Sequence, residues 1–202
     1  MDAASLAGDA RVLTERIEST EQLDQLTERA SKLFNEALDR TGWRDFLSGK
    51  WLGHPLHPAL TDLPIGFWTS AMLVDFLGGK RSKRAATLLV ASGIASAVPT
   101  AMAGAHDFTG LDPKAKRVGL VHAAANSAGL LLYIASLFNR MRGRRGRGIY
   151  LGVLGAAAAT VGGYLGGHLV FGADNEAAVP KVERDATDPN TNGLSVVTAS
   201  AL

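Results

Sequence analysis

Five histidines carry most of the chemistry that this sequence offers, and all of them lie in or beside its hydrophobic segments. They are His54, His57, His106, His122 and His168. Imidazole is the commonest side-chain ligand for transition metals, and paired histidines on facing helices of a bundle are a usual way to hold haem iron. If the fold brings these side chains together, they predict a metal or haem site.

Four hydrophobic segments must position the histidines. Three of them, residues 85–105, 118–138 and 149–172, contain no charged side chain and are 21 to 24 residues long. That is the length with which a helix rising about 1.5 Å per residue crosses roughly 30 Å of hydrocarbon. A fourth segment, residues 59–77, contains only Asp62 and Asp75 as charged residues. We therefore predict an all-α fold, an integral membrane four-helix bundle with spans at about 58–78, 85–105, 118–138 and 149–171.

Alternating span directions place all five histidines on one side of the membrane. His54 and His57 precede the first span, and His106 ends the second. His122 lies about one turn into the third span, and His168 lies about one turn before the end of the fourth. The last two are thus at similar depth, about 5 Å inside the same boundary. We predict that His122 and His168 bind the cofactor, either haem b or another transition metal.

Further polar residues on the same side complete the predicted site. His54, His57, His106 and Asp107 are expected nearer the water, as a second metal site, as groups around the first site or as partners of haem propionates. Asp62, Asn126 and Tyr164 are expected to support it, because a polar group in hydrocarbon is costly unless it faces the bundle interior, pairs or does chemistry. Asn126 follows His122 by one helical turn, so the two share a face.

Small residues recur every fourth position in the fourth span, at Gly155, Ala159, Gly163 and Gly167. Small residues at this spacing let helix backbones approach closely in lipid. We interpret the column as a helix-packing surface.

The two ends of the chain differ from the membrane domain, residues 51–172. Residues 1–50 carry apolar side chains at three- and four-residue spacing, which predicts one long amphipathic helix broken at Gly42. That helix could pack on the rest of the protein, on a second copy of the chain or on the membrane surface. Residues 173–202 are polar and without periodicity, which predicts a disordered tail.

Charge in the connections predicts the topology. Residues 79–84, GKRSKR, contain four basic residues and no acid, and residues 140–148, RMRGRRGRG, contain five and no acid. The positive-inside rule then gives a multi-pass protein of the plasma (inner) membrane with both termini outside. We interpret these loops as topological signals and predict no nucleic-acid partner. The chain has no cysteine, so it cannot ligate an iron–sulfur cluster by itself.

Three stretches resemble the DUF2231 family, bacterial four-helix membrane proteins. They are GHPLHPALTDLPIGFWTSAMLVD, RVGLVHAAANSAGLLLYIASL and GGYLGGHLV, within residues 50–172. In many relatives a Rieske-type iron–sulfur domain follows the last span, whereas the tail here is about thirty residues long and lacks cysteine. The resemblance implies a redox setting in which any iron–sulfur partner is a separate polypeptide.

Three functions follow from these observations. The first is a membrane redox module with a histidine-rich haem or metal site on the outer side, exchanging electrons with a separate iron–sulfur or other redox protein. The second is a non-catalytic membrane anchor or assembly module. The third is a metal-dependent hydrolase or metal-handling protein that uses His54, His57, His106 and Asp107. We find no nucleophile–base pair, phosphate-binding loop or paired carboxylates, and expect no enzyme activity of the chain alone.

Overall fold

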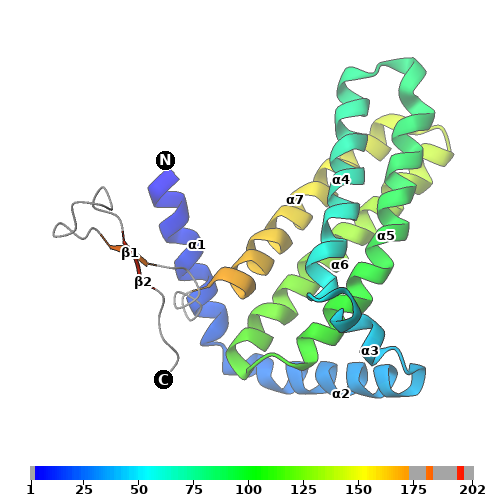
Figure 1. Cartoon of the computed structure of the whole chain (residues 1–202). Coiled ribbons are helices and arrows are strands. Elements are labelled where there is room, and N and C mark those ends of the chain that lie inside the picture. Colours follow the sequence, from blue (N-terminus) through cyan, green and yellow to red (C-terminus); the bar gives the residue numbers. More distant parts are fainter. Residues whose placement is uncertain (1–2, 173–180, 184–194, 198–202) are drawn as a thin grey trace. The chain divides into compact units, whose positions relative to one another are not determined.

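The computed structural model describes residues 3–172, 181–183 and 195–197, and this part of the chain is almost entirely helical (Figure 1). It divides into two units, Met1–Gly166 and Gly167–Leu202. The helices are α1 (Ala3–Glu18), α2 (Asp24–Thr41), α3 (Arg44–Leu47), α4 (Leu56–Leu77), α5 (Lys83–Thr109), α6 (Pro113–Met141) and α7 (Arg145–Phe171). Single 3-10 turns precede α2, α4 and α5, at Glu21–Leu23, Lys50–Leu52 and Lys80–Ser82. The predicted all-α class is confirmed.

The four long helices, α4 to α7, lie at the four predicted spans, and each begins before its predicted start. Asp112 caps α6 by accepting hydrogen bonds from the backbone N–H groups of Lys114 and Ala115, so the helix begins at Pro113, five residues before the uncharged run. By length and composition α5, α6 and α7 can cross a membrane. The prediction of four spans is therefore supported for three helices. The shorter α4, with Asp62 and Asp75, is not among them.

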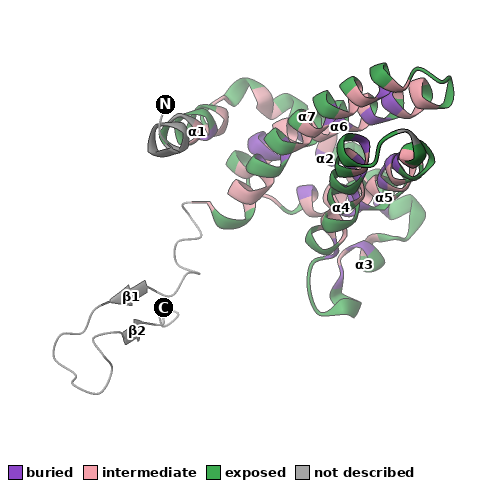
Figure 2. Cartoon of the chain, turned by 90° about the horizontal axis from the view of Figure 1, so that it is seen from above, coloured by how far each residue is buried: buried purple, intermediate pink, exposed green. Residues whose placement is uncertain are grey.

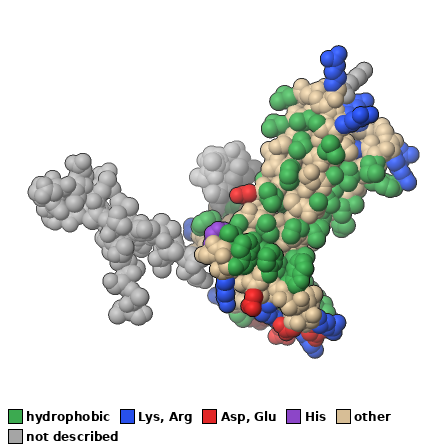
Figure 3. Space-filling model, turned by 45° about the vertical axis from the view of Figure 1, so that its right-hand side comes forward, with side chains coloured by type: hydrophobic (Ala, Val, Ile, Leu, Met, Phe, Trp, Pro, Cys, Tyr) green, Lys and Arg blue, Asp and Glu red, His purple; other side chains and the backbone are tan. Residues whose placement is uncertain are grey.

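The outer faces of the long helices are apolar. Large exposed side chains include Phe76, Leu88, Leu131 and Val161. In Figure 2, which colours the cartoon by burial, buried residues lie on faces turned toward neighbouring helices, and exposed residues cover much of the outer faces. In Figure 3 hydrophobic side chains spread over the long helices, Lys and Arg gather at one end, and Lys, Arg, Asp and Glu lie together at the other end. A helix surface that is apolar toward its surroundings is suited to lipid.

Helices α6 and α7 run antiparallel along a stripe of glycines. A Cβ at Gly155 would lie 3.0 Å from the Tyr133 ring, and one at Gly162 would lie 2.5 Å from the Asn126 amide. Gly163, in contrast, has open space around its Cα. The packing stripe therefore steps from Gly155 to Gly162 and Gly166 rather than along every fourth residue. An α-helix has about 3.6 residues per turn, so a strict four-residue column drifts away from the contact.

An aromatic stack fills the middle of the bundle. The rings of Trp68 in α4 and Tyr133 in α6 are nearly parallel, with centroids 4.0 Å apart. They form a core with Ala71 and Val90. Gly93 in α5 makes room for the indole, because a Cβ there would lie 2.2 Å from Trp68 Nε1. The stack and this close approach fix α4, α5 and α6 against one another.

The N-terminal region before Gly42 is helical as predicted, but it forms two helices, α1 and α2, rather than one. The hydroxyls of Ser19 and Thr20 both donate to the Arg16 carbonyl, at 3.0 and 2.6 Å, and the chain leaves α1 there. Such side-chain bonds compete with the helical ladder and favour a turn. The predicted break at Gly42 is confirmed, since this residue ends α2 with a φ of 68°.

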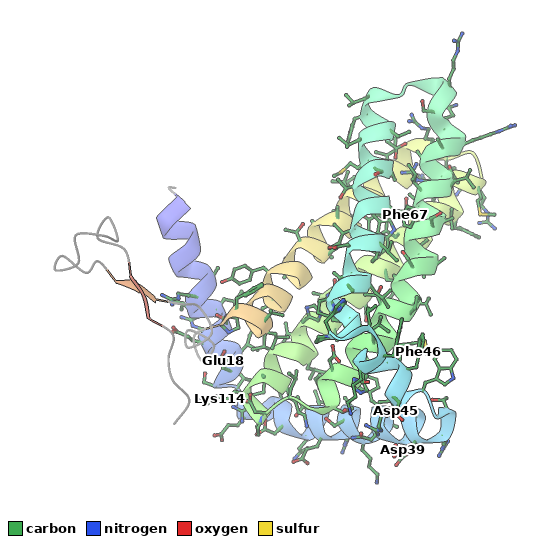
Figure 4. The ribbon with its side chains drawn as sticks, in the orientation of Figure 1. Glu18, Asp39, Asp45, Phe46, Phe67 and Lys114 are labelled. Atoms are coloured by element: carbon green, nitrogen blue, oxygen red, sulfur yellow. The ribbon has the colours of Figure 1, made fainter. Side chains whose placement is uncertain are left out.

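Helix α2 packs on the ends of α5 and α6. Phe34 meets Phe108 edge to face, with centroids 5.8 Å apart. Leu38 joins a buried cluster with Leu56 and Ala103. The contact between α1 and the start of α6 lies where Glu18 and Lys114 are labelled in Figure 4. The predicted apolar stripe is thus only partly buried against the rest of the protein, and Leu33 within it stays exposed.

The segment between α2 and α4 carries exposed aromatic residues. Phe46 stacks on Trp51 with centroids 5.4 Å apart, and Trp51 Nε1 donates to the Phe46 carbonyl at 2.9 Å. Gly49 is required in this turn, because its φ is 72° and a Cβ would lie 2.2 Å from the His54 carbonyl oxygen. This turn leads into α4, which begins at Leu56.

Most of the predicted disordered tail, residues 173–202, lies outside the described residues. Within it, β1 (Lys181–Glu183) and β2 (Ser195–Val197) pair antiparallel, with Val182 opposite Val196.

Candidate functional site

His57 lies in the first turn of α4 and is held by α5. Its Nδ1 lies 2.9 Å from the Thr100 carbonyl oxygen. Gly104, one turn further along α5, leaves space for the ring, since a Cβ there would lie 2.9 Å from His57 Cε1. Pro58 follows in the same first turn, where its missing N–H is tolerated. The ring is therefore fixed by one hydrogen bond and one close backbone surface.

His122 lies about a third of the way along α6 and is held by α7 in the same manner. Its Nδ1 lies 2.8 Å from the Gly162 carbonyl oxygen, and a Cβ at Gly166 would lie 2.9 Å from its Cε1. Asn126 lies one turn further along α6, as the spacing predicted. Its Nδ2 donates to the His122 carbonyl at 3.0 Å and lies 3.3 Å from His122 Nε2.

These two hydrogen bonds determine the tautomer of both rings. A backbone carbonyl can only accept, so Nδ1 carries a proton in His57 and in His122. In the neutral ring the lone pair is then on Nε2, the atom available to a metal. A metal-binding histidine commonly donates its other ring N–H to a carbonyl, which orients the ring and raises its basicity. Both side chains have this arrangement.

The two rings form a pair, which the sequence did not predict. Their centroids are 6.2 Å apart and their planes are 84° from one another. Two imidazoles that bind one ion through metal–nitrogen bonds of about 2 Å have ring centres about 5 to 6.5 Å apart. The separation of the His57 and His122 ring centres lies within that range. No group of three or more His, Cys, Asp or Glu residues suited to a metal occurs among the described residues.

The predicted water-side set is not brought into one group. His54 is exposed, and its Nδ1 lies 3.2 Å from the neighbouring Pro55 carbonyl oxygen. His106 pairs with Asp107, with 3.0 Å between Nδ1 and Oδ1. Of the four residues only His57 enters the pair with His122.

The other predicted residues lie apart from the pair or in the second unit. Asp62 is exposed on α4, and within the described chain no hydrogen bond joins it to a histidine. Tyr164 is 44% exposed on α7. His168 lies in the last turn of α7 and belongs to the unit Gly167–Leu202. Its predicted pairing with His122 stays a prediction.

At the opposite end of the bundle, a buried charge cluster joins α4, α6 and α7. Asp75 is bound by Arg140 through both carboxylate oxygens and by Arg145 at 3.0 Å. The Asp75 and Arg140 side chains are 2% and 4% exposed. Arg140 also donates to Ser136 Oγ at 3.1 Å, and Ser136 donates to the Gly148 carbonyl. The sequence signal was a lone acid at the end of a span beside two basic loops.

A second ion pair attaches the N-terminal helices to α6. Arg117 binds both carboxylate oxygens of Asp24, at 2.7 and 2.8 Å, and donates to the Glu18 carbonyl. It therefore holds the end of α1 and the start of α2 together. The hydrogen bonds from Arg117 hold the pKa of Asp24 below its ordinary value. Nothing local in the sequence indicates this contact.

Comparison with known protein families gives one match. Residues 53–176 match the family model DUF2231, described as a predicted membrane protein. This region contains α4 to α7 and all five histidines. No curated protein and no solved structure matched the chain.

Proposed function

Because the chain belongs to the DUF2231 family of predicted membrane proteins, we propose that it is a membrane redox module that binds haem iron or another transition metal through His57 and His122. The observation that carries this proposal is the matched pair of hydrogen bonds from Nδ1 to backbone carbonyls. They hold two imidazoles side by side and leave Nε2 of each ring as the ligand atom.

The number of ligands favours electron transfer over hydrolysis. A catalytic zinc site takes three protein ligands and a structural one takes four, whereas two axial imidazoles suffice for haem iron. Asn126 adds an amide near His122 Nε2, at 3.3 Å, and no carboxylate joins the pair among the described residues. Bound haem iron or copper would supply one-electron chemistry.

The chain's own residues would orient and tune such a centre. The Thr100 and Gly162 carbonyls keep the two rings in place, and the packed glycines at 104 and 166 prevent them from turning. Since the chain has no cysteine, an iron–sulfur partner would be a separate polypeptide. The proposed module would exchange electrons with that partner.

The test is to purify the full chain in mild detergent from cells supplied with haem and metals. Oxidised and dithionite-reduced visible spectra are recorded together with metal analysis. An α-band on reduction supports haem, and bound copper without a Soret band supports a copper site. A folded protein without chromophore or metal contradicts the proposal and leaves the anchor function. Stoichiometric zinc would also contradict a redox role.

A further inference from the structure

The end of the bundle opposite the histidine pair has an excess of positive charge. It consists of two loops, residues 79–84 and 140–148, which we call the basic end. The first loop contains four basic residues, the second contains five, and neither contains an acid. The acid beside them, Asp75, is fully engaged by Arg140 and Arg145. Within the described chain no acidic partner is found for Arg81, Lys83, Arg84, Arg144 or Arg147.

Two of these unpaired cations line an open groove. Its lining residues are Lys83, Arg84, Thr87, Leu88 and Arg140. Lys83 and Arg84 are exposed at the start of α5, whereas Arg140 is held in place by Asp75. The groove therefore offers two exposed cations beside one that is held in place. The N-terminus of the 27-residue α5 adds partial positive charge at the same place.

One helical turn below these cations the groove becomes apolar. Leu88 follows Arg84 by four residues and is 67% exposed. Phe76, Leu77 and Met141, also exposed, lie at the ends of α4 and α6 next to the basic loops. A ligand that fits both parts has an anionic head and a hydrocarbon tail.

We propose that this groove binds an anionic phospholipid, with its phosphate on Lys83 and Arg84 and an acyl chain along Leu88. Basic side chains at a membrane boundary attract anionic headgroups. The apolar continuation favours a lipid over a free phosphate ion, which would gain nothing from Leu88. Thr87 lies between the two parts and donates its hydroxyl proton to the Lys83 carbonyl at 2.8 Å. Its oxygen can therefore accept a hydrogen bond from a headgroup hydroxyl, such as the glycerol of phosphatidylglycerol.

The experiment compares lipids on the purified full chain in detergent. Native mass spectrometry measures binding of phosphatidylglycerol and of phosphatidylcholine with identical acyl chains. The wild type is expected to prefer phosphatidylglycerol, and Lys83→Gln/Arg84→Gln should weaken that binding about thirtyfold. The matched control, Arg144→Gln/Arg147→Gln, removes the same charge outside the groove and should retain the binding. All four side chains are exposed, so the fold should be kept.

Four results would overturn the proposal. Equal binding of the two lipids would exclude headgroup recognition. Equal losses in both double variants would indicate diffuse attraction to the basic end instead of a site. Displacement of the lipid by millimolar inorganic phosphate would indicate a simple anion site. A salt series on the wild type is independent of any variant, and phosphatidylglycerol binding that does not weaken with salt would also contradict the proposal.

Discussion

His57 and His122 lie with their ring centroids 6.2 Å apart, and each ring is hydrogen-bonded to a helix other than its own. His57 in α4 binds the Thr100 carbonyl of α5, and His122 in α6 binds the Gly162 carbonyl of α7. One pair of imidazoles thus connects all four long helices. The site is positioned by the packed bundle rather than by a loop, and rigid elements hold a metal geometry best.

The glycine beside His122 gives a test that removes no ligand. In Gly166→Ala the new Cβ would lie 2.9 Å from His122 Cε1, so the ring must move and its bond to the Gly162 carbonyl must lengthen. We expect metal or haem affinity to fall about tenfold or more, the range found when a ligand's orienting partner is lost. Titration of the metal-free protein with haem or Cu(I) measures it.

The control for this variant is Gly163→Ala, on the same helix. Gly163 has no atom within 4 Å of an added Cβ, and alanine is a better helix former than glycine. Its affinity should equal that of the wild type. If both variants bind as the wild type does, the ring of His122 is not a ligand held in this orientation.

The buried cluster at the other end makes a prediction about stability. Asp75→Ala leaves Arg140 and Arg145 without a counter-charge, and loss of one partner in a buried pair costs about 3–5 kcal/mol. We expect a clearly lower Tm in detergent. Arg145→Gln should cost less, because Arg145 is 25% exposed and Arg140 still binds Asp75.

The exposed acid Asp45 in α3 provides a control for Asp75. Asp45→Ala removes the same group where it has no ion pair among the described residues, so the free energy of unfolding should change by only about 0.5 kcal/mol. Similar losses in Asp45→Ala and Asp75→Ala would mean that the cluster contributes nothing specific.

The ion pair of Asp24 with Arg117 predicts a pH dependence. Hydrogen bonds from Arg117 lower the pKa of Asp24 in the folded protein below its ordinary value of 3.8. The pair therefore stabilises the fold fully above that value, and this contribution disappears as the pH falls through the lower, folded pKa. Asp24→Asn lacks it at every pH. The Tm difference between the wild type and Asp24→Asn should be present at pH 7. It should shrink as the pH falls below about 4.

Melting curves between pH 3 and about 7 measure that difference. Asp45→Asn is again the matched control, because it removes a carboxylate from the same N-terminal region and should show no such convergence with the wild type. A Tm gap for Asp24→Asn that stays constant to acidic pH would contradict the assignment of the effect to this carboxylate.

The sequence predicted the helices and half of the site. Uncharged runs identified α5, α6 and α7, and the four-residue spacing placed Asn126 beside His122. The partner of His122 was assigned by depth, counted from the ends of the uncharged runs. The pairing of His122 with His168 that this count predicts stays a prediction, because His168 belongs to the second unit. In the fold His122 lies beside His57, a residue that was expected nearer the water.

Contacts between distant segments could not be read from the sequence. Arg117 and Asp24 are 93 residues apart, and both belong to stretches rich in charge, so no local pattern pairs them. The carbonyls that orient the rings come from Thr100 and Gly162, and any residue type supplies a carbonyl. The glycines at 104 and 166 were the one available signal, but they are hidden among many other glycines.

Bound haem or metal per protein, measured by metal analysis and visible spectra in His57→Ala, His122→Ala, His168→Ala and His54→Ala, tests the central claim most directly. If His57 and His122 are the ligands, both of their variants lose the bound group, and His54→Ala retains it because His54 is exposed and outside the pair. Loss in His122→Ala and His168→Ala with retention in His57→Ala would contradict the pair and favour the partner expected from depth. Full retention in His57→Ala and His122→Ala would contradict the account altogether.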